Sequence, residues 1–148
     1  MYTVTRRIEF DSAHRVLGHG GKCAHLHGHR YAAEITARST GLDNLSMVVD
    51  FGVIKNLLSE WIDKHWDHNI ILNGDDPLLS VKSHTVFGDR APYILPRDAN
   101  PTAEVLAKIL FQQATILLPS SIAVTRLRLY ETPNCWADYT AEDEATTV

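Results

Sequence analysis

Apolar and polar residues alternate near the start of the chain, and a period of two predicts strands. Tyr2–Phe10 is rich in β-branched and aromatic residues, with its apolar positions on one alternation, and His27–Arg38 is a second candidate strand. Turn-forming residues at 39–44 close this second strand. We expect the two strands to pair antiparallel across a long connection that holds residues 11–26.

The same alternation returns near the end of the chain. In Val124–Glu131, leucines alternate with arginines, which predicts a strand with one solvated face. Cys135–Thr140 is the expected partner strand, joined to the first through a turn at residues 132–134. The last eight residues, 141–148, are acidic and polar, and we expect a solvated, disordered-like tail.

Two segments between these strands show helical spacing instead. Residues 51–66 carry an apolar stripe at helical intervals, and Asp50 before them is a suitable N-cap. Pro101 and Thr102 open a second helix, which ends before Pro119. The inner positions of the two helices are Ile54, Leu57, Leu58, Trp61, Ile62 and Trp66, then Leu106, Ile109, Leu110, Gln113 and Leu117.

Residues 74–100 lack any sustained period, because glycines and prolines interrupt them, although Ser80–Phe87 and Tyr93–Leu95 could form short strands. A long irregular connection of this kind is usually functional or mobile. Strands flank the two helices without alternating with them. This order favours a single α+β domain over residues 1–148, with a four-stranded antiparallel sheet, both helices on one face, and an irregular insertion at about 74–100.

The composition is that of a globular protein, and we expect it in the cytoplasm. Of 148 residues, 45% are hydrophobic and 22% charged, and the net charge of −4 gives no basic field for nucleic acid or an anionic membrane. The N-terminal residues lack the apolar core of a signal peptide, and no apolar run is long enough to span a bilayer. Two cysteines, Cys23 and Cys135, are too few for a disulfide framework.

Candidate metal chemistry is concentrated in residues 23–30, CAHLHGHR. In a strand, His27 and His29 point to the same face about 6–7 Å apart, so both can reach one ion. A third nitrogen would come from His14 or from its rival His25. Three neutral imidazoles around one open position are typical of a catalytic zinc site. A His-x-His pair alone is weak evidence, because many surface loops carry one, and His19, His65 and His84 are more simply surface or core residues.

Four further residues could carry chemistry. Cys23 could be a metal ligand, although the histidines already offer enough donors; it could equally be a base or nucleophile, or a small buried hydrophobe. Asp67 could orient His68 for acid–base work, although a capping pair at a helix end is the simpler interpretation. Glu131 could accept two hydrogen bonds from the amino-amide edge of a pterin or guanine, or be one more surface glutamate.

Six motifs, in order, resemble the 6-pyruvoyltetrahydropterin synthase / 6-carboxytetrahydropterin synthase family over nearly the whole chain. They are Phe10-Asp11-Ser12-Ala13-His14; Cys23-x-x-x-His27-Gly28-His29; Val49-Asp50-Phe51 with Ile54-Lys55; Asp67-His68-Asn69 with Leu72-Asn73; Pro101-Thr102-Ala103-Glu104; and Tyr130-Glu131-Thr132. One such motif is weak evidence, whereas six in the right order are highly specific.

The resemblance implies roles for the clustered residues. His14, His27 and His29 would hold Zn²⁺. Cys23 would be the base rather than a ligand, and His25 would fall on a variable position. The implied fold is the tunnelling fold, in which a four-stranded antiparallel sheet and two helices assemble into trimeric barrels. These barrels usually pair into homohexamers, with active sites between subunits.

The resemblance also implies a substrate, 7,8-dihydroneopterin triphosphate, and the residues that meet it. Asp67 and His68 would complete a proton relay, and Glu131 would be the catalytic-site residue that anchors the pterin. The segment holding Thr102 and Glu104 would also bind substrate. In the carboxy branch, the products are 6-carboxy-5,6,7,8-tetrahydropterin, acetaldehyde and triphosphate, on the route to queuosine and other 7-deazapurines.

The short spacing from Cys23 to His27, and the segments 49–51 and 101–104, favour the carboxy branch. The alternatives are a 6-pyruvoyltetrahydropterin synthase, a metal-free aldolase or epimerase acting on dihydroneopterin, and a non-catalytic zinc- or pterin-binding module. Two features depart from the family pattern: residues 74–100 are long, and one extra residue lies between His68 and Leu72.

Overall fold

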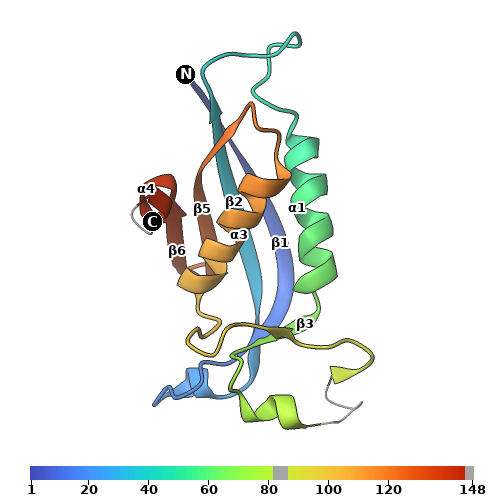
Figure 1. Ribbon diagram of the computed structural model, residues 1–148, viewed down its shortest axis with the longest axis vertical. Helices are drawn as coiled ribbons and strands as arrows, with labels where there is room; N and C mark the ends of the chain where they lie inside the picture. Colours follow the sequence, from blue (N-terminus) through green and yellow to red (C-terminus); the bar gives the residue numbers. More distant parts are fainter. Residues whose placement is uncertain (82–86, 146–148) are drawn as a thin grey trace.

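The computed structural model describes residues 1–81 and 87–145. Six strands form one mixed sheet in the order β4-β3-β1-β2-β5-β6, and two long helices lie side by side over it (Figure 1). The strands are β1 (Tyr2–His14), β2 (His27–Ser39), β3 (Asn69–Leu72), β4 (Tyr93–Ile94), β5 (Ala123–Thr132) and β6 (Cys135–Thr140). The helices are α1 (Phe51–His65), α3 (Ala103–Leu117) and the short α4 (Ala141–Ala145), with 3₁₀ turns η1 (Lys22–Ala24) and η2 (Pro77–Ser80).

β1 and β2 form the expected antiparallel pair, with Tyr2 opposite Ser39 at one end and His14 opposite His27 at the other. β1 runs further than the sequence indicates, so the connection holds residues 15–26 rather than 11–26. The alternation of apolar and polar residues does not reveal the end of this strand, because its inward positions are occupied by polar Ser12 and His14. Both side chains are buried. This extension brings His14 beside the histidines of β2.

The sheet has six strands and is mixed, so the expectation of four antiparallel strands is wrong, whereas the α+β class is confirmed. β3 runs parallel to β1 along Ser12–His14, and β4 runs parallel to β3. Strands of four and two residues are too short to show a period of two. Tertiary contacts hold β3 instead, including a 3.0 Å hydrogen bond from Ser12 Oγ to the carbonyl of Asn69.

α1 and α3 confirm the helical interpretation, and each begins at a side-chain cap. Asp50 accepts a 2.6 Å hydrogen bond from Gly52 N–H, and Thr102 accepts one of 3.4 Å from Val105 N–H. The apolar sides of both helices pack on one face of the sheet and form a single core (Figure 1). Its largest fully buried side chains include Phe10, Tyr31, Ile35, Ile54, Leu58, Ile62, Trp66, Leu106, Leu110 and Leu127. No helix in the described ranges is long and apolar enough to cross a membrane.

The opposite face of the sheet is charged, and none of the described helices covers it. Alternation along the strands places Arg30 and Arg128 there. Arg30 pairs with Asp11 and Arg128 with Asp138, each at 2.7 Å. Exposed pairs of this kind contribute little stability. The solvated face predicted for the β5 segment is therefore present, and it extends across the neighbouring strands.

The long connection between α1 and α3 is only partly regular. Tyr93–Ile94 confirms the short strand expected near this position. The strand expected over Ser80–Phe87 is wrong at its start, because Pro77–Ser80 forms η2, and residues 82–86 lie outside the described part. Proline at the first position of η2 favours this turn over an extended strand.

The acidic end of the chain forms a short helix where a disordered-like tail was expected. α4 covers 141–145, and residues 146–148 lie outside the described part. Thr140 N–H donates a 2.8 Å hydrogen bond to Asp143, and Tyr139 O–H donates one of 2.6 Å to Glu144. These specific contacts order a segment whose composition alone indicates disorder.

An ion pair with a buried carboxylate fixes the connection between α1 and α3 against the end of β1. Arg15, just after β1, forms two hydrogen bonds of 2.7 and 2.5 Å with the fully buried carboxylate of Asp76. Burial alone would raise the pKa of Asp76, but hydrogen bonds from Arg15 and from Leu78 N–H bring it below the ordinary 3.8. Asp76→Asn is expected to lower the free energy of unfolding by about 3 kcal/mol near neutral pH, because it leaves Arg15 unpaired.

The pH dependence of the stability lost in Asp76→Asn tests whether the loss comes from the Arg15–Asp76 pair. A carboxyl group whose pKa is lowered by folding stabilises the folded protein at pH values above its ordinary pKa. This stabilisation is lost as the pH falls through the pKa of the folded state. The difference between wild type and Asp76→Asn should therefore shrink below about pH 4 in urea titrations. Asp75→Asn is the matched control, since Asp75 forms an exposed pair with Arg97 and should change stability by less than about 0.5 kcal/mol. Equal losses from both variants would contradict this assignment.

Candidate active site

Three histidines meet at one end of the β1–β2 pair. His14 ends β1 directly opposite His27, and His29 lies two residues further along the same face of β2. The ring centroids are 4.7 Å apart for His14 and His27, 5.1 Å for His14 and His29, and 4.8 Å for His27 and His29. One nitrogen from each ring lies within 4.8 Å of the other two. The three can therefore bind one metal ion.

Hydrogen bonds orient two of these rings. His14 Nδ1 lies 2.6 Å from the carbonyl oxygen of Pro101, and His27 Nδ1 lies 2.6 Å from that of His25. Because a carbonyl oxygen only accepts, each Nδ1 carries the proton and each Nε2 keeps a free lone pair. The Nε2 atoms of His14 and His29 are buried without a hydrogen-bond partner among the described residues. A metal ion would satisfy both nitrogens, so the residues present fit one.

Burial favours the neutral form of two of these rings, those of His14 and His29, and the neutral form is the one that binds metal. Burial lowers the pKa of His14 below its ordinary value, and this outweighs the opposing effects of the Pro101 carbonyl and the Glu131 carboxylate. Burial likewise lowers the pKa of His29. Of the two candidates for the third nitrogen, the structure places His14 in the cluster and leaves His25 exposed and outside it.

Cys23 lies in η1 and lines a cavity of about 300 Å³ that also reaches His14. It is half-buried and forms no disulfide. The other residues around the cavity are Val16, His19, Thr102, Ala103, Glu104, Glu131, Cys135 and Trp136. The structure therefore brings Cys23, Thr102, Glu104 and Glu131 to one cavity beside the three clustered histidines.

Glu131 faces the histidines from the end of β5. Its Oε1 lies 3.6 Å from His29 Nε2, and its Oε2 lies 3.9 Å from His14 Nε2. The pairing of β5 with β6 is irregular at this residue, and bulges of this kind often occur beside active sites. The side chain is only 25% exposed, so a half-buried carboxylate is available as an acceptor inside the cavity.

A model of the family described as 6-pyruvoyl tetrahydropterin synthase matches residues 3–142. This chain belongs to that family. A 6-carboxy-5,6,7,8-tetrahydropterin synthase of Rickettsia typhi is 43% identical over 140 residues, which cover 93% of this chain and 99% of that protein. A protein of the same name from Aquifex aeolicus is 30% identical and covers 95% of this chain and 99% of that protein.

Solved structures share the fold. An uncharacterised protein from Wolinella succinogenes has a TM-score of 0.76 at 23% identity and covers 95% of this chain and 98% of that chain. The 6-pyruvoyl tetrahydropterin synthase of Caenorhabditis elegans has a TM-score of 0.68 at 21% identity and covers 95% of both chains. At these identities the likeness extends to the fold alone.

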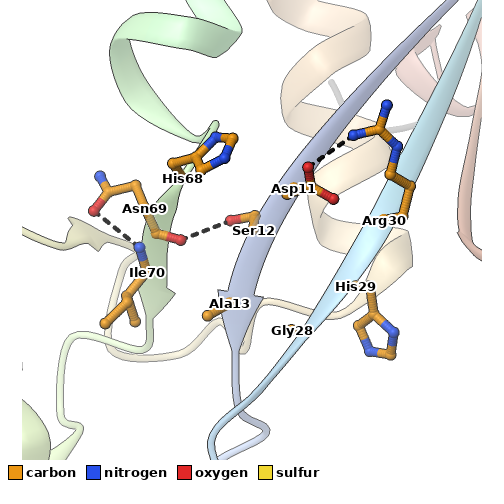
Figure 2. Close-up of a pocket in the computed structure, with 9 residues that line it drawn as sticks. All are labelled: Asp11, Ser12, Ala13, Gly28, His29, Arg30, His68, Asn69 and Ile70. Atoms are coloured by element: carbon orange, nitrogen blue, oxygen red, sulfur yellow. Dashed lines mark hydrogen bonds and ion pairs between the residues drawn. The ribbon is translucent and has the colours of Figure 1, made fainter.

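Asp67 and His68, expected to act with Cys23, lie elsewhere in this family member. His68 lines a second cavity of about 470 Å³, together with Asp11, Arg30 and His29 of the histidine cluster (Figure 2). In Figure 2 the side chains of Arg30 and His29 leave β2 in opposite directions, as alternation requires. Within one chain, His68 is therefore not among the residues around the Cys23 cavity.

Asp67 and His68 nevertheless form an ordered pair. Asp67 Oδ1 accepts a 2.9 Å hydrogen bond from Asp11 N–H, and Asp67 Oδ2 lies 2.7 Å from His68 Nδ1. The hydrogen bond that His68 donates to Asp67 raises the pKa of His68. Burial alone would raise the pKa of Asp67, but the hydrogen bonds from Asp11 and His68 lower it. His68 is 75% exposed and has a φ of 53°, so the pair presents an oriented imidazole outward.

A second group, Asp11, Asp67 and His68, also brings three potential metal ligands together. Its ligand atoms already have partners: Arg30 donates to Asp11, while Asp67 receives hydrogen bonds from Asp11 N–H and His68. This group is therefore better suited to moving a proton than to holding an ion.

Sequence reasoning missed several features of this site. Pro101 and His25 contribute backbone carbonyl oxygens, which leave no trace in side-chain patterns. His19, interpreted from sequence as a surface or core residue, is exposed, and the structure adds that it lines the Cys23 cavity. Its position four residues before Cys23 was the only available signal.

Proposed function

We propose that this protein is a zinc-dependent 6-carboxy-5,6,7,8-tetrahydropterin synthase. It would convert 7,8-dihydroneopterin triphosphate and water into 6-carboxy-5,6,7,8-tetrahydropterin, acetaldehyde and triphosphate, within 7-deazapurine biosynthesis. The observation that carries this proposal is the near full-length identity of 43% to a protein of that name. The grouping of three histidines, Cys23 and Glu131 around one end of the sheet supports it.

His14, His27 and His29 would hold the zinc ion through their Nε2 atoms. Three nitrogen ligands with one open position are the usual donor set of catalytic zinc. When bound, zinc supplies Lewis-acid polarisation of substrate oxygens. The carbonyl oxygens of Pro101 and His25 keep two of the rings in the required tautomer and orientation.

The remaining side chains of the cavity would bind the pterin and move protons. The Glu131 carboxylate would accept paired hydrogen bonds from the amino-amide edge of the pterin ring. Thr102 and Glu104, at the start of α3, would add further contacts to the substrate. The Cys23 thiolate would remove a proton from the substrate side chain beside the histidines.

The separation of His68 from Cys23 supports an active site completed by a second copy of the chain. Two strand edges are open to such a copy: β3 covers β1 only along Ser12–His14, and the outer edge of β6 pairs with no described strand. If these edges paired between copies of the chain, neither edge would be left open to solvent. It would also turn the charged sheet face inward as the lining of a barrel. We propose trimeric barrels that pair into a homohexamer, with the Asp67–His68 pair of one chain reaching the Cys23 cavity of another.

The experiment that tests the activity is incubation of zinc-loaded protein with 7,8-dihydroneopterin triphosphate, with measurement of released triphosphate. Stoichiometric release is the expected result. Binding without release would favour a zinc- or pterin-binding module. Turnover of dihydroneopterin lacking its phosphates, in protein stripped of metal, would favour an aldolase or epimerase.

A further inference from the structure

The Cys23 cavity contains one histidine to which no role has yet been given. His19 lies in the β1–β2 connection and lines the cavity with Cys23, Glu104 and Glu131. No lysine or arginine is among the described residues around this cavity. The two carboxylates would repel a polyphosphate rather than hold it. The triphosphate end of the substrate therefore needs a hydrogen-bond donor that neither glutamate can supply.

His19 is held as such a donor. The N–H of Gly21 donates a 2.8 Å hydrogen bond to His19 Nδ1. A nitrogen that accepts this bond carries no proton, so the neutral ring has its proton on Nε2. The ring lies close over Gly21, since a Cβ placed there would be 3.1 Å from His19 Cε1 and 3.3 Å from Nδ1. The Nε2–H group is thus oriented before any ligand arrives.

The connection that carries His19 is itself fixed to the site. His19 N–H donates to the carbonyl of Val16 at 3.2 Å, and Val16 N–H donates to the carbonyl of Cys23 at 2.7 Å. The side chain of Asn100 bonds both backbone groups of Leu17 at 3.0 Å, which ties the connection to the start of α3. A donor fixed in this way loses little conformational entropy when it binds a ligand.

We infer that His19 is a substrate-contacting residue whose Nε2–H donates a hydrogen bond to a phosphate oxygen of the leaving triphosphate. The inference rests on the proposed function, because the phosphate tail belongs to that substrate. A hydrogen bond to an anionic oxygen is stronger than one between neutral groups. His19 therefore contributes affinity for the tail, whereas Glu131 contributes affinity for the ring.

The test compares binding of two probes to zinc-loaded protein by calorimetry: inorganic triphosphate, and 7,8-dihydroneopterin without phosphates. His19→Phe keeps a ring but removes the donor, and should weaken triphosphate binding about tenfold or more. His19→Gln keeps an N–H donor and should lose less than about threefold. Dihydroneopterin should bind both variants within about twofold of wild type. His25→Phe, a substitution at an exposed histidine outside the cavity, is the matched control.

A second variant moves the ring without removing it. Gly21 has an extended backbone, with φ −126°, so Gly21→Ala is free of backbone strain and only presses on the His19 ring. It should weaken triphosphate binding by an amount between those of the two His19 variants. Unchanged triphosphate binding in His19→Phe would overturn the inference, and so would an equal loss for dihydroneopterin. A wild-type protein that makes no product would refute the proposed function instead, and the triphosphate comparison would still decide the role of His19.

Discussion

Cys23→Ala is expected to lower kcat/KM for 7,8-dihydroneopterin triphosphate by about a thousandfold, while the protein keeps its metal. The reason is that Cys23 lines the cavity beside His14 but lies outside the group of three histidines whose nitrogens converge. The variant lacks the proposed proton acceptor but keeps every nitrogen proposed to bind the metal. Turnover assays, with zinc content measured by atomic absorption on the same samples, check both parts.

Two further variants make this result specific. Cys135 also lines the cavity, but it is exposed at the start of β6, and Cys135→Ala should keep activity within about threefold. His27→Ala should lose both zinc and turnover, because it removes one of three nitrogens. Release of zinc by Cys23→Ala would show that the thiol is a ligand, and the role proposed for Cys23 would then be wrong.

Two inactive variants are expected to restore activity when they form mixed oligomers. Cys23→Ala lacks the proposed base, and His68→Asn lacks the relay imidazole; asparagine is chosen because His68 has a positive φ of 53° that asparagine tolerates. If each site takes Cys23 from one chain and His68 from another, random mixing leaves about a quarter of the sites intact. Co-expression with two different affinity tags and sequential purification would isolate the mixed oligomers for assay.

The alternative arrangement makes the opposite prediction. If Cys23 and His68 of one chain served the same site, no site in a mixed oligomer would be complete, and activity would stay at the level of the single variants. The two cavities of one chain, with His68 in one and Cys23 in the other, are the reason to expect recovery.

Much of this fold can be predicted from the sequence, because apolar residues recur at regular intervals along its long helices and strands. α1 and α3 follow from helical stripes and from caps at Asp50 and Thr102. The remainder depends on contacts between distant residues. β3 and β4 are too short for a period and are defined by their neighbours, while α4 is ordered by hydrogen bonds to Glu144 and Asp143 that composition does not reveal.

The candidate site divides in the same way. The pairing of His27 with His29 follows from strand alternation, but the inclusion of His14 depends on the register that places it opposite His27. Sequence spacing alone left His25 open as the third nitrogen. The separation of Asp67–His68 from Cys23 does not follow from sequence either, because the order of motifs along the chain does not show which cavity each one lines.

The most direct test of the central claim follows the three side-chain carbons of the substrate. Zinc-loaded protein would be incubated with 7,8-dihydroneopterin triphosphate carrying carbon-13 throughout that side chain, and volatile aldehydes would be trapped before mass spectrometry. A carboxy synthase should yield acetaldehyde with two labelled carbons and 6-carboxytetrahydropterin with one, in equal amounts. A pterin product that keeps all three labelled carbons, with no acetaldehyde, would contradict the account and indicate a pyruvoyl synthase.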